Sequence, residues 1–258
     1  MTSVLAVVNQ KGGTGKTTTA ANLAFALTAE GRRVLAVDVD PQASLTFYFG
    51  HDERRLEAEE RTLYWALTGA RPLADLVLAG PPALVPASIA LAKADAELLS
   101  EPGASWVLKE VLAPLRDTYD VILLDCPPTL TLLTVNALAA ADAVLIPVKT
   151  DLLSSLGITQ LLDTVRKVQR RANPDLAVLG VLPTLFNARF GHDAEVLAEL
   201  RATFAPTLEV FEPIPRSTAF DRAAGTGQPT VMLDPDSAGA QAYRRLARRL
   251  LETIDGQG

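Results

Sequence analysis

Two lysines and three glycines lie within seven consecutive residues near the start of the chain, in the segment KGGTGKT that spans residues 11–17. A strand-like apolar run, Val4 to Val8, precedes this segment, and a helix-length segment, Lys16 to Glu30, follows it. Glycines let backbone N–H groups turn inward around phosphate oxygens, and the N-terminus of the next helix adds its positive dipole end. This context favours nucleotide binding over a plain glycine turn with a solvated lysine.

Two polar residues of the loop have the chemistry that phosphate binding needs. Lys16 supplies a point charge for the β- and γ-phosphates, and the hydroxyl of Thr17 is placed to bind magnesium. The sequence therefore predicts ATP and Mg²⁺ as cofactors. The predicted nucleotide-binding residues are Lys11, Gly12, Gly13, Thr14, Gly15, Lys16, Thr17 and Thr18.

Three aspartates follow two further apolar runs. Asp38 and Asp40 end the run that starts at Val34, and Asp125 ends the run 121–124. Side chains alternate along a strand, so Asp38 and Asp40 point to the same side. We expect all three carboxylates at the mouth of the sheet, where magnesium and the γ-phosphate would sit. In the competing interpretation, either Asp38 or Asp40 merely caps the next helix.

The elements that must position these residues alternate between strand and helix. Short apolar runs predict buried strands at 4–8, 34–37, 121–124, 143–148 and 176–182. Helix-length segments lie at 16–30, 106–115, 130–140 and 154–171. The alternation predicts an α/β fold in which helices cover both faces of a mostly parallel twisted sheet, within one P-loop ATPase domain over residues 1–258. A variable helical excursion is expected over 51–70 and 79–87.

Composition narrows the function classes. The net charge of −6 argues against a protein coated by nucleic acid, so any DNA site must be a local basic patch. Cys126 is the single cysteine, which excludes an intramolecular disulfide or a multi-thiolate metal site within one chain. The N-terminus lacks the pattern of a signal peptide, and no apolar stretch reaches the length of a membrane span. We expect a cytoplasmic protein.

The phosphate loop departs from the ordinary pattern and resembles a known variant. Gln10 stands where the common motif has its first glycine, and Lys11 precedes the glycine pair. This arrangement resembles the deviant Walker A motif of the superfamily that includes ParA, MinD and the nitrogenase iron protein. Three further segments extend the resemblance over nearly the whole chain. They are DVDPQ (38–42), which follows Val37, DCPP (125–128) and IPR (214–216).

The resemblance implies particular roles. In that family the early lysine reaches across a dimer interface, so Lys11 would contact the partner's phosphates. The likeness assigns Asp40 to orienting the attacking water, Asp38 to the magnesium environment, and Asp125 to a Walker B position near magnesium. Lys11, Lys16 and Asp40 are thus the expected catalytic residues. Pro215 matches the proline that lies against the adenine.

Within the superfamily the chain most resembles the short ParA/Soj-type partitioning ATPases, which lack an N-terminal helix-turn-helix domain. The alternative is a MinD-like, membrane-cycling or cell-division positioning ATPase. The segment Tyr243 to Ile254 is a basic amphipathic helix, but only residues 252–258 extend past it, which is too little for an added membrane tail. An iron–sulfur bridge would need two thiolates per subunit, and metabolic P-loop kinases match only the loop.

The expected function is therefore ATP-dependent DNA segregation by a nucleoid-associated protein that does not bind membranes. An ATP-bound homodimer would bind double-stranded DNA without sequence preference, and a ParB/Spo0J-like protein would accelerate slow ATP hydrolysis. Clustered arginines would contact the phosphates. The candidates are Arg189, Arg216, Arg222, Arg244, Arg245, Arg248 and Arg249.

Overall fold

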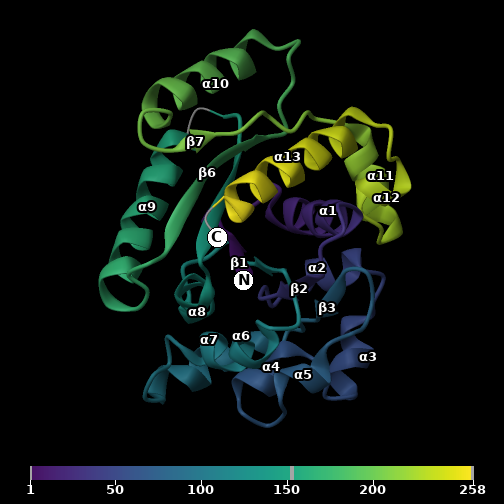
Figure 1. The fold of residues 1–258 in the computed structure, drawn as a ribbon, viewed down its shortest axis with the longest axis vertical. Coiled ribbons are helices and arrows are strands. Elements are labelled where there is room, and N and C mark those ends of the chain that lie inside the picture. Colours follow the sequence, from purple (N-terminus) through teal and green to yellow (C-terminus); the bar gives the residue numbers. More distant parts are fainter. Residues whose placement is uncertain (1, 152–153, 257–258) are drawn as a thin grey trace.

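A seven-stranded parallel sheet forms the centre of the computed structural model, which describes residues 2–151 and 154–256 (Figure 1). The strand order is β3-β2-β4-β1-β5-β6-β7. This confirms the predicted α/β fold and its parallel sheet. The strands are β1 (Ser3–Val7), β2 (Val34–Asp38), β3 (Ala83–Val85), β4 (Val121–Asp125), β5 (Ala143–Lys149), β6 (Ala177–Thr184) and β7 (Glu209–Val210).

Helices cover both faces of the sheet. The first half of the chain contributes α1 (Lys16–Ala29), α2 (Ser44–Tyr48), α3 (Glu53–Ala58), α4 (Leu63–Leu67), α5 (Leu73–Leu76), α6 (Leu91–Glu97) and α7 (Val107–Leu112). The second half contributes α8 (Leu132–Ala140), α9 (Ser154–Arg171), α10 (Gly191–Phe204), α11 (Thr218–Thr226), α12 (Thr230–Leu233) and α13 (Ala238–Asp255). Short 3₁₀ turns at Leu98–Ser100 and Ala113–Leu115 follow α6 and α7.

The two faces of the sheet carry separate apolar clusters. Leu5 and Val7 of β1 pack with α1 and α13, whereas Val4 and Ala6 pack on the opposite face with α8 and α9. This division follows from the alternation of side chains along a strand. Figure 1 shows α1 and α13 side by side over the first face.

The strand order explains why the polar segments meet. In the sheet β1 lies between β4 and β5, and β2 lies on the far side of β4. Because these strands are parallel and adjacent, the carboxyl ends of β1, β2 and β4 lie next to one another, along what we call the carboxyl edge of the sheet. The register aligns Asp125 with both Val7 and Asp38. In open parallel sheets ligands bind at this edge, where the order of the strands reverses.

The expectation of a helical excursion over 79–87 is wrong in part, because residues Ala83–Val85 form β3. This strand pairs with Leu35–Val37 of β2, and its three side chains are buried. A strand of three residues is too short to show a periodicity, and the flanking prolines and glycine suggested a loop. The sequence analysis also lacked β7, which has two residues.

The edge of the sheet at β6 and β7 depends on a glycine. Gly180 has a φ of 153° and pairs with Glu209 of β7. A Cβ atom at position 180 would lie 2.2 Å from the Glu209 carbonyl oxygen and 3.0 Å from the ring of Phe211. Because glycine has no side chain, β7 can approach β6 this closely at position 180.

We expect Gly180→Ala to lower the free energy of unfolding by about 2 kcal/mol or more, because the new methyl group collides with the backbone of β7. Urea unfolding followed by circular dichroism measures this change. Gly157→Ala in α9 is the matched control, since no atom lies within 4 Å of the added carbon. Equal stability of the two variants would contradict the close approach of β7.

Candidate nucleotide-binding site

The glycine-rich loop lies between the end of β1 and the start of α1. Gly13 and Gly15 have positive φ values of 70° and 79°, a conformation that side chains other than glycine rarely adopt. The hydroxyl of Thr184 contacts the carbonyl oxygens of Thr14, at 2.9 Å, and of Val148, at 3.1 Å. The loop is thereby held against β5 and β6, with the N-terminus of α1 open to an anion.

Lys16 lies inside this loop. The residue is 7% exposed, and its Nζ donates a hydrogen bond to the carbonyl of Lys11 at 3.2 Å. Burial lowers the pKa of Lys16, while the nearby carboxylates of Asp125 and Asp40 raise it in part. The ammonium group therefore lies between the glycine-rich loop and the two aspartates, which is the arrangement that phosphate binding requires.

Asp38 and Asp125 are both fully buried and lie at the same level of adjacent strands. Burial raises the pKa of Asp38 to about 7, and burial together with the charge of Asp38 raises the pKa of Asp125 well above its usual range. Neither oxygen of Asp125 has a hydrogen bond of standard geometry, although the Thr17 hydroxyl lowers its pKa in part. A buried carboxylate with free oxygens is suited to a cation.

The side chains at this site suit magnesium better than a metal whose ligands all come from the protein. Within residues 2–151 and 154–256, no group of three or more histidine, cysteine, aspartate or glutamate side chains is arranged to hold a metal. Magnesium commonly uses one or two carboxylates and takes its other ligands from phosphates and water. Asp125 and Thr17 would supply the protein side of such a site.

Asp38 is held by the protein more firmly than Asp125. Its Oδ2 accepts hydrogen bonds from the backbone N–H and the hydroxyl of Thr46, each at 2.8 Å, and its Oδ1 accepts from the Asp40 N–H at 3.2 Å. The Thr46 hydroxyl in turn accepts from the N–H of Ala87 at 2.9 Å. Asp38 therefore also anchors the segment 40–46 to the loop after β3.

The sequence analysis missed Thr46. The threonine was visible eight residues after Asp38, but its partner Ala87 is distant in the sequence. Only the pairing of β3 with β2 brings the two together.

Asp40 lies at the entrance to the same site and is 8% exposed. Its Oδ1 accepts from the N–H of Gln42 at 2.9 Å, which fixes the turn after β2. Its charge raises the pKa of Lys16, so the carboxylate faces that ammonium group. Asp40 and Lys16 thus lie close together at the carboxyl end of the sheet.

Lys11 points out of the loop, unlike Lys16. Its side chain is 41% exposed and forms an ion pair with Asp151, which follows the end of β5. Its backbone N–H donates to the side chain of Asn9 at 2.9 Å.

Pro215, for which the resemblance implies contact with the adenine, lies beside the loop. A cavity of ≈ 210 Å³ is lined by Pro215 together with Gly13, Gly15 and Thr18. Pro215 also pairs with Phe186 in an isolated parallel bridge that follows β6. This cavity therefore borders the glycine-rich loop and the segment that contains Pro215.

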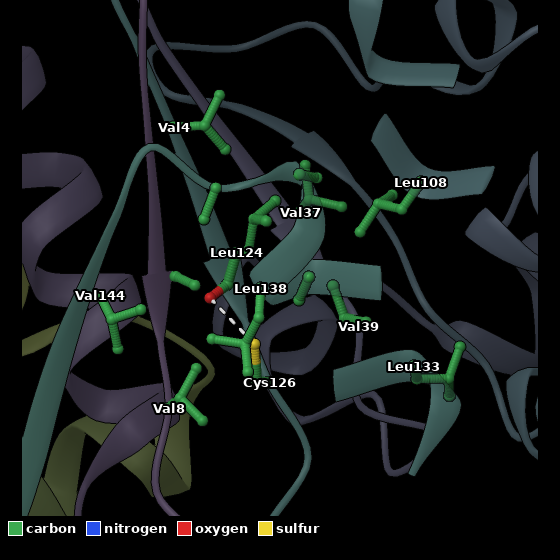
Figure 2. Packing of buried hydrophobic residues seen from close by; sticks show 14 of the residues in the cluster. Val4, Val8, Val37, Val39, Leu108, Leu124, Cys126, Leu133, Leu138 and Val144 are labelled. Atoms are coloured by element: carbon green, nitrogen blue, oxygen red, sulfur yellow. Dashed lines mark hydrogen bonds between the residues drawn. The ribbon is translucent and has the colours of Figure 1, made fainter. Parts of the chain in front are cut away.

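Cys126 belongs to the apolar core. The residue is 1% exposed and packs among Val8, Leu138 and Val144 (Figure 2). Its thiol contacts the carbonyl of Leu124 at 3.7 Å. Burial raises the pKa of this thiol well above its usual value, which makes it a poor nucleophile.

The seven candidate arginines do not share one environment. Arg222 pairs with Asp234 and Arg248 with Glu30, each at 2.7 Å, and Arg249 pairs with Glu209 and Glu252. Among the described residues, no ion pair involves the other four, which are Arg189, Arg216, Arg244 and Arg245. Arg216 lines a second cavity with Lys149 and Phe190. Arg248 lies instead at the end of α1 away from the loop.

The basic helix at the C-terminus packs by its apolar face. Tyr243, Leu246 and Leu250 of α13 are buried against α1 and the sheet. In the described part of the chain, the helices are too short or too polar to cross a membrane.

Comparisons with known proteins show the family to which the chain belongs. The AAA domain family matches residues 2–178. The sporulation initiation inhibitor protein Soj of Bacillus subtilis is 39% identical over 254 residues, which covers 97% of this chain and 98% of Soj. The chromosome partitioning protein ParA of Myxococcus xanthus is 39% identical over 255 residues, which covers 96% of this chain and 88% of that protein.

A solved structure is similarly close. The crystal structure of a protein called cobyrinic acid a,c-diamide synthase, from Mycobacterium smegmatis, contains an ATP analogue and magnesium. It is 40% identical and has a TM-score of 0.87, and the match covers 100% of this chain and 98% of that one.

We expect Lys16→Ala to weaken ATP binding by roughly a hundredfold or more, because a charge-assisted contact to the phosphates is lost in a buried loop. Lys11→Ala should leave the affinity of the monomer largely unchanged, since that side chain points away from the loop. Titration with a fluorescent ATP analogue measures both affinities. Equal losses in the two variants would contradict the different placement of the two lysines.

Proposed function

The chain belongs to the ParA/Soj family of AAA-domain P-loop ATPases, and we propose that residues 1–258 act as one ATPase domain that segregates DNA. The observation that carries this proposal is that the two lysines of the loop have different surroundings. Lys16 is buried between the loop and the carboxylates of Asp40 and Asp125, whereas Lys11 points outward. One lysine is placed to bind phosphate within the subunit, and the other is available to a second subunit.

ATP with magnesium is the substrate that this site supports. The phosphates would lie against the N–H groups of Gly13 to Lys16, and Asp125 with Thr17 would hold the metal. Magnesium supplies neutralisation of the charge that develops on the β- and γ-phosphates. Asp40 would orient the attacking water next to Lys16. Hydrolysis is slow in this proposal, because a switch that hydrolysed quickly would not hold its ATP-bound state.

The ATP-bound state is a homodimer in this proposal. Lys11 leaves Asp151 and reaches the phosphates of the second ATP, so that dimerisation reports the presence of the γ-phosphate. The ion pair is partly exposed, with side-chain exposures of 41% and 26%, and such pairs are worth little in water. Exchanging Asp151 for a phosphate is therefore energetically accessible. A ParB-like partner would accelerate hydrolysis and return the dimer to monomers.

Double-stranded DNA is the proposed binding partner, and the protein binds it without sequence preference. Arg189, Arg216 and Arg245 lead the candidates because all three are exposed and none of them forms an ion pair among the described residues. Arg222, Arg248 and Arg249 are neutralised by adjacent acids and should contribute less. The overall charge of −6 makes such local clusters necessary.

A MinD-like cycle on membranes is the alternative, and the packing of α13 weighs against it. A helix that inserts into a membrane surface needs a free apolar face. In α13 that face is buried on α1, and Tyr243 is 1% exposed. The exposed face of α13 carries arginines instead.

We expect Asp40→Ala to lower ATP turnover by roughly a hundredfold while ATP binding survives, because water is no longer oriented for attack. The variant should accumulate as a long-lived dimer with ATP. Lys11→Ala should bind ATP and remain monomeric. Gel filtration with ATP and a phosphate-release assay measure these outcomes. Unchanged turnover in Asp40→Ala, or a normal dimer in Lys11→Ala, would refute the corresponding role.

We expect Arg216→Ala and Arg189→Ala each to reduce the slope of log affinity against log salt by about 0.9 on duplex DNA, because one phosphate contact is lost. Arg248→Ala is the matched control, and its slope should not change because that guanidinium is already paired with Glu30. The titrations use two unrelated duplexes of equal length, with ATP and with ADP, and lipid vesicles in parallel. Tight binding with ADP, strong preference for one duplex, or binding to the vesicles instead would contradict the proposal.

A further inference from the structure

An aromatic ring forms part of the wall of the cavity beside the phosphate loop, which we call the base-side cavity. Phe220 of α11 lines the ≈ 210 Å³ cavity that also contains Pro215, Gly13 and Thr18. The same ring lines a second ≈ 210 Å³ cavity, next to Arg216. Phe220 therefore stands between the two spaces, and its position sets the size of the cavity that continues from the phosphate loop.

Helix α13 holds this ring in place. Gly239 and Tyr243 are four residues apart and so lie on the same face of the helix. The rings of Phe220 and Tyr243 meet edge to face, with centroids 5.9 Å apart and an angle of 88°. A Cβ atom at position 239 would lie 2.4 Å from Cζ and 2.7 Å from Cε2 of Phe220. The ring fills the notch that this buried glycine leaves in the helix.

Tyr243 connects the same contact to the phosphate loop. Its hydroxyl and that of Thr19 in α1 form a buried hydrogen bond of 2.9 Å. Thr19 follows Lys16 by one turn, and its N–H donates to the carbonyl of Gly15. The base-side wall and the first turn of α1 are thus fixed to one another through a single tyrosine of the last helix.

We propose that α13 builds the base-recognition wall of the nucleotide site, with Phe220 packing against the purine opposite Pro215 and with Gly239 as its positioning residue. Flat apolar walls suit a purine ring, and aromatic pairs gain from offset or edge-on packing. This inference rests on the proposed function, because it assumes that the cavity holds the base of ATP. It assigns a role in substrate binding to a segment more than two hundred residues after the loop.

The test separates the base from the phosphates by comparing ATP with inorganic tripolyphosphate, each with magnesium. Gly239→Ala forces the Phe220 ring out of its place against α13 and so disturbs the wall of the cavity. We expect the Kd for ATP to rise roughly tenfold, a typical effect of overpacking a filled site. The Kd for tripolyphosphate should change by less than about twofold, because the substitution leaves the hydrogen bond between Tyr243 and Thr19 in place. The KM for ATP should rise in the same way, with kcat nearly unchanged.

Two further variants make the result specific. Gly225→Ala in α11 is the matched control, because nothing lies within 4 Å of its added carbon, and it should bind ATP as the unaltered protein does. In a Phe220→Leu background the ring is gone, so Gly239→Ala should have no further effect on ATP affinity. Phe220→Leu alone should weaken ATP and leave tripolyphosphate unchanged, which keeps the proposal testable if Gly239→Ala does not fold.

The outcomes distinguish this inference from the proposed function. Equal loss of ATP and tripolyphosphate affinity in Gly239→Ala, the same loss with and without the Phe220 ring, or unchanged ATP affinity in Phe220→Leu would each overturn the wall. If the unaltered protein binds neither ATP nor tripolyphosphate, the proposed ATPase function itself fails.

Discussion

The balance of charge at the carboxyl edge of the sheet is the constraint on which the rest of the structure depends. Asp38 and Asp125 are buried at the same level of adjacent strands, and Lys16 is the cation that faces Asp125 and Asp40. Buried charges are costly unless they are paired or bind a metal. Burial lowers the pKa of Lys16 and raises those of the two aspartates, so each group is unfavourable alone. A bound phosphate and a divalent cation would satisfy all of them together.

Uncharged side chains around the charged groups fix this arrangement. Thr184 holds the loop against β5 and β6, and Thr46 holds Asp38 against the loop after β3. Tyr243 fixes α13 to the first turn of α1. Three hydroxyl groups from distant parts of the chain therefore set the positions of the charged groups. Hydrogen bonds between buried partners give such positions their precision, because an unmade bond there is costly.

The outward-facing groups have weaker constraints. Lys11 is held by a partly exposed ion pair with Asp151, and several surface arginines have nearby carboxylate partners. These interactions are screened by solvent and exchange readily. Groups held in this way can change partner at little energetic cost. This contrast between a firmly held loop and adaptable surface cations would suit the ATP-controlled switch that we propose for this member of the ParA/Soj family.

The sequence by itself determined the phosphate loop, the aspartates, most strands and the helices α1, α7, α8, α9 and α13, because glycine spacing and buried apolar runs are local signals. It did not predict α10. The two shortest strands, β3 and β7, were missed, since two or three residues carry no periodicity. The partners of Thr46, Lys11 and Arg248 were equally out of reach. The Gly239 notch beneath Phe220 also exists only in the folded chain. Such contacts join residues far apart in sequence, and only the packing of strands and helices brings them together.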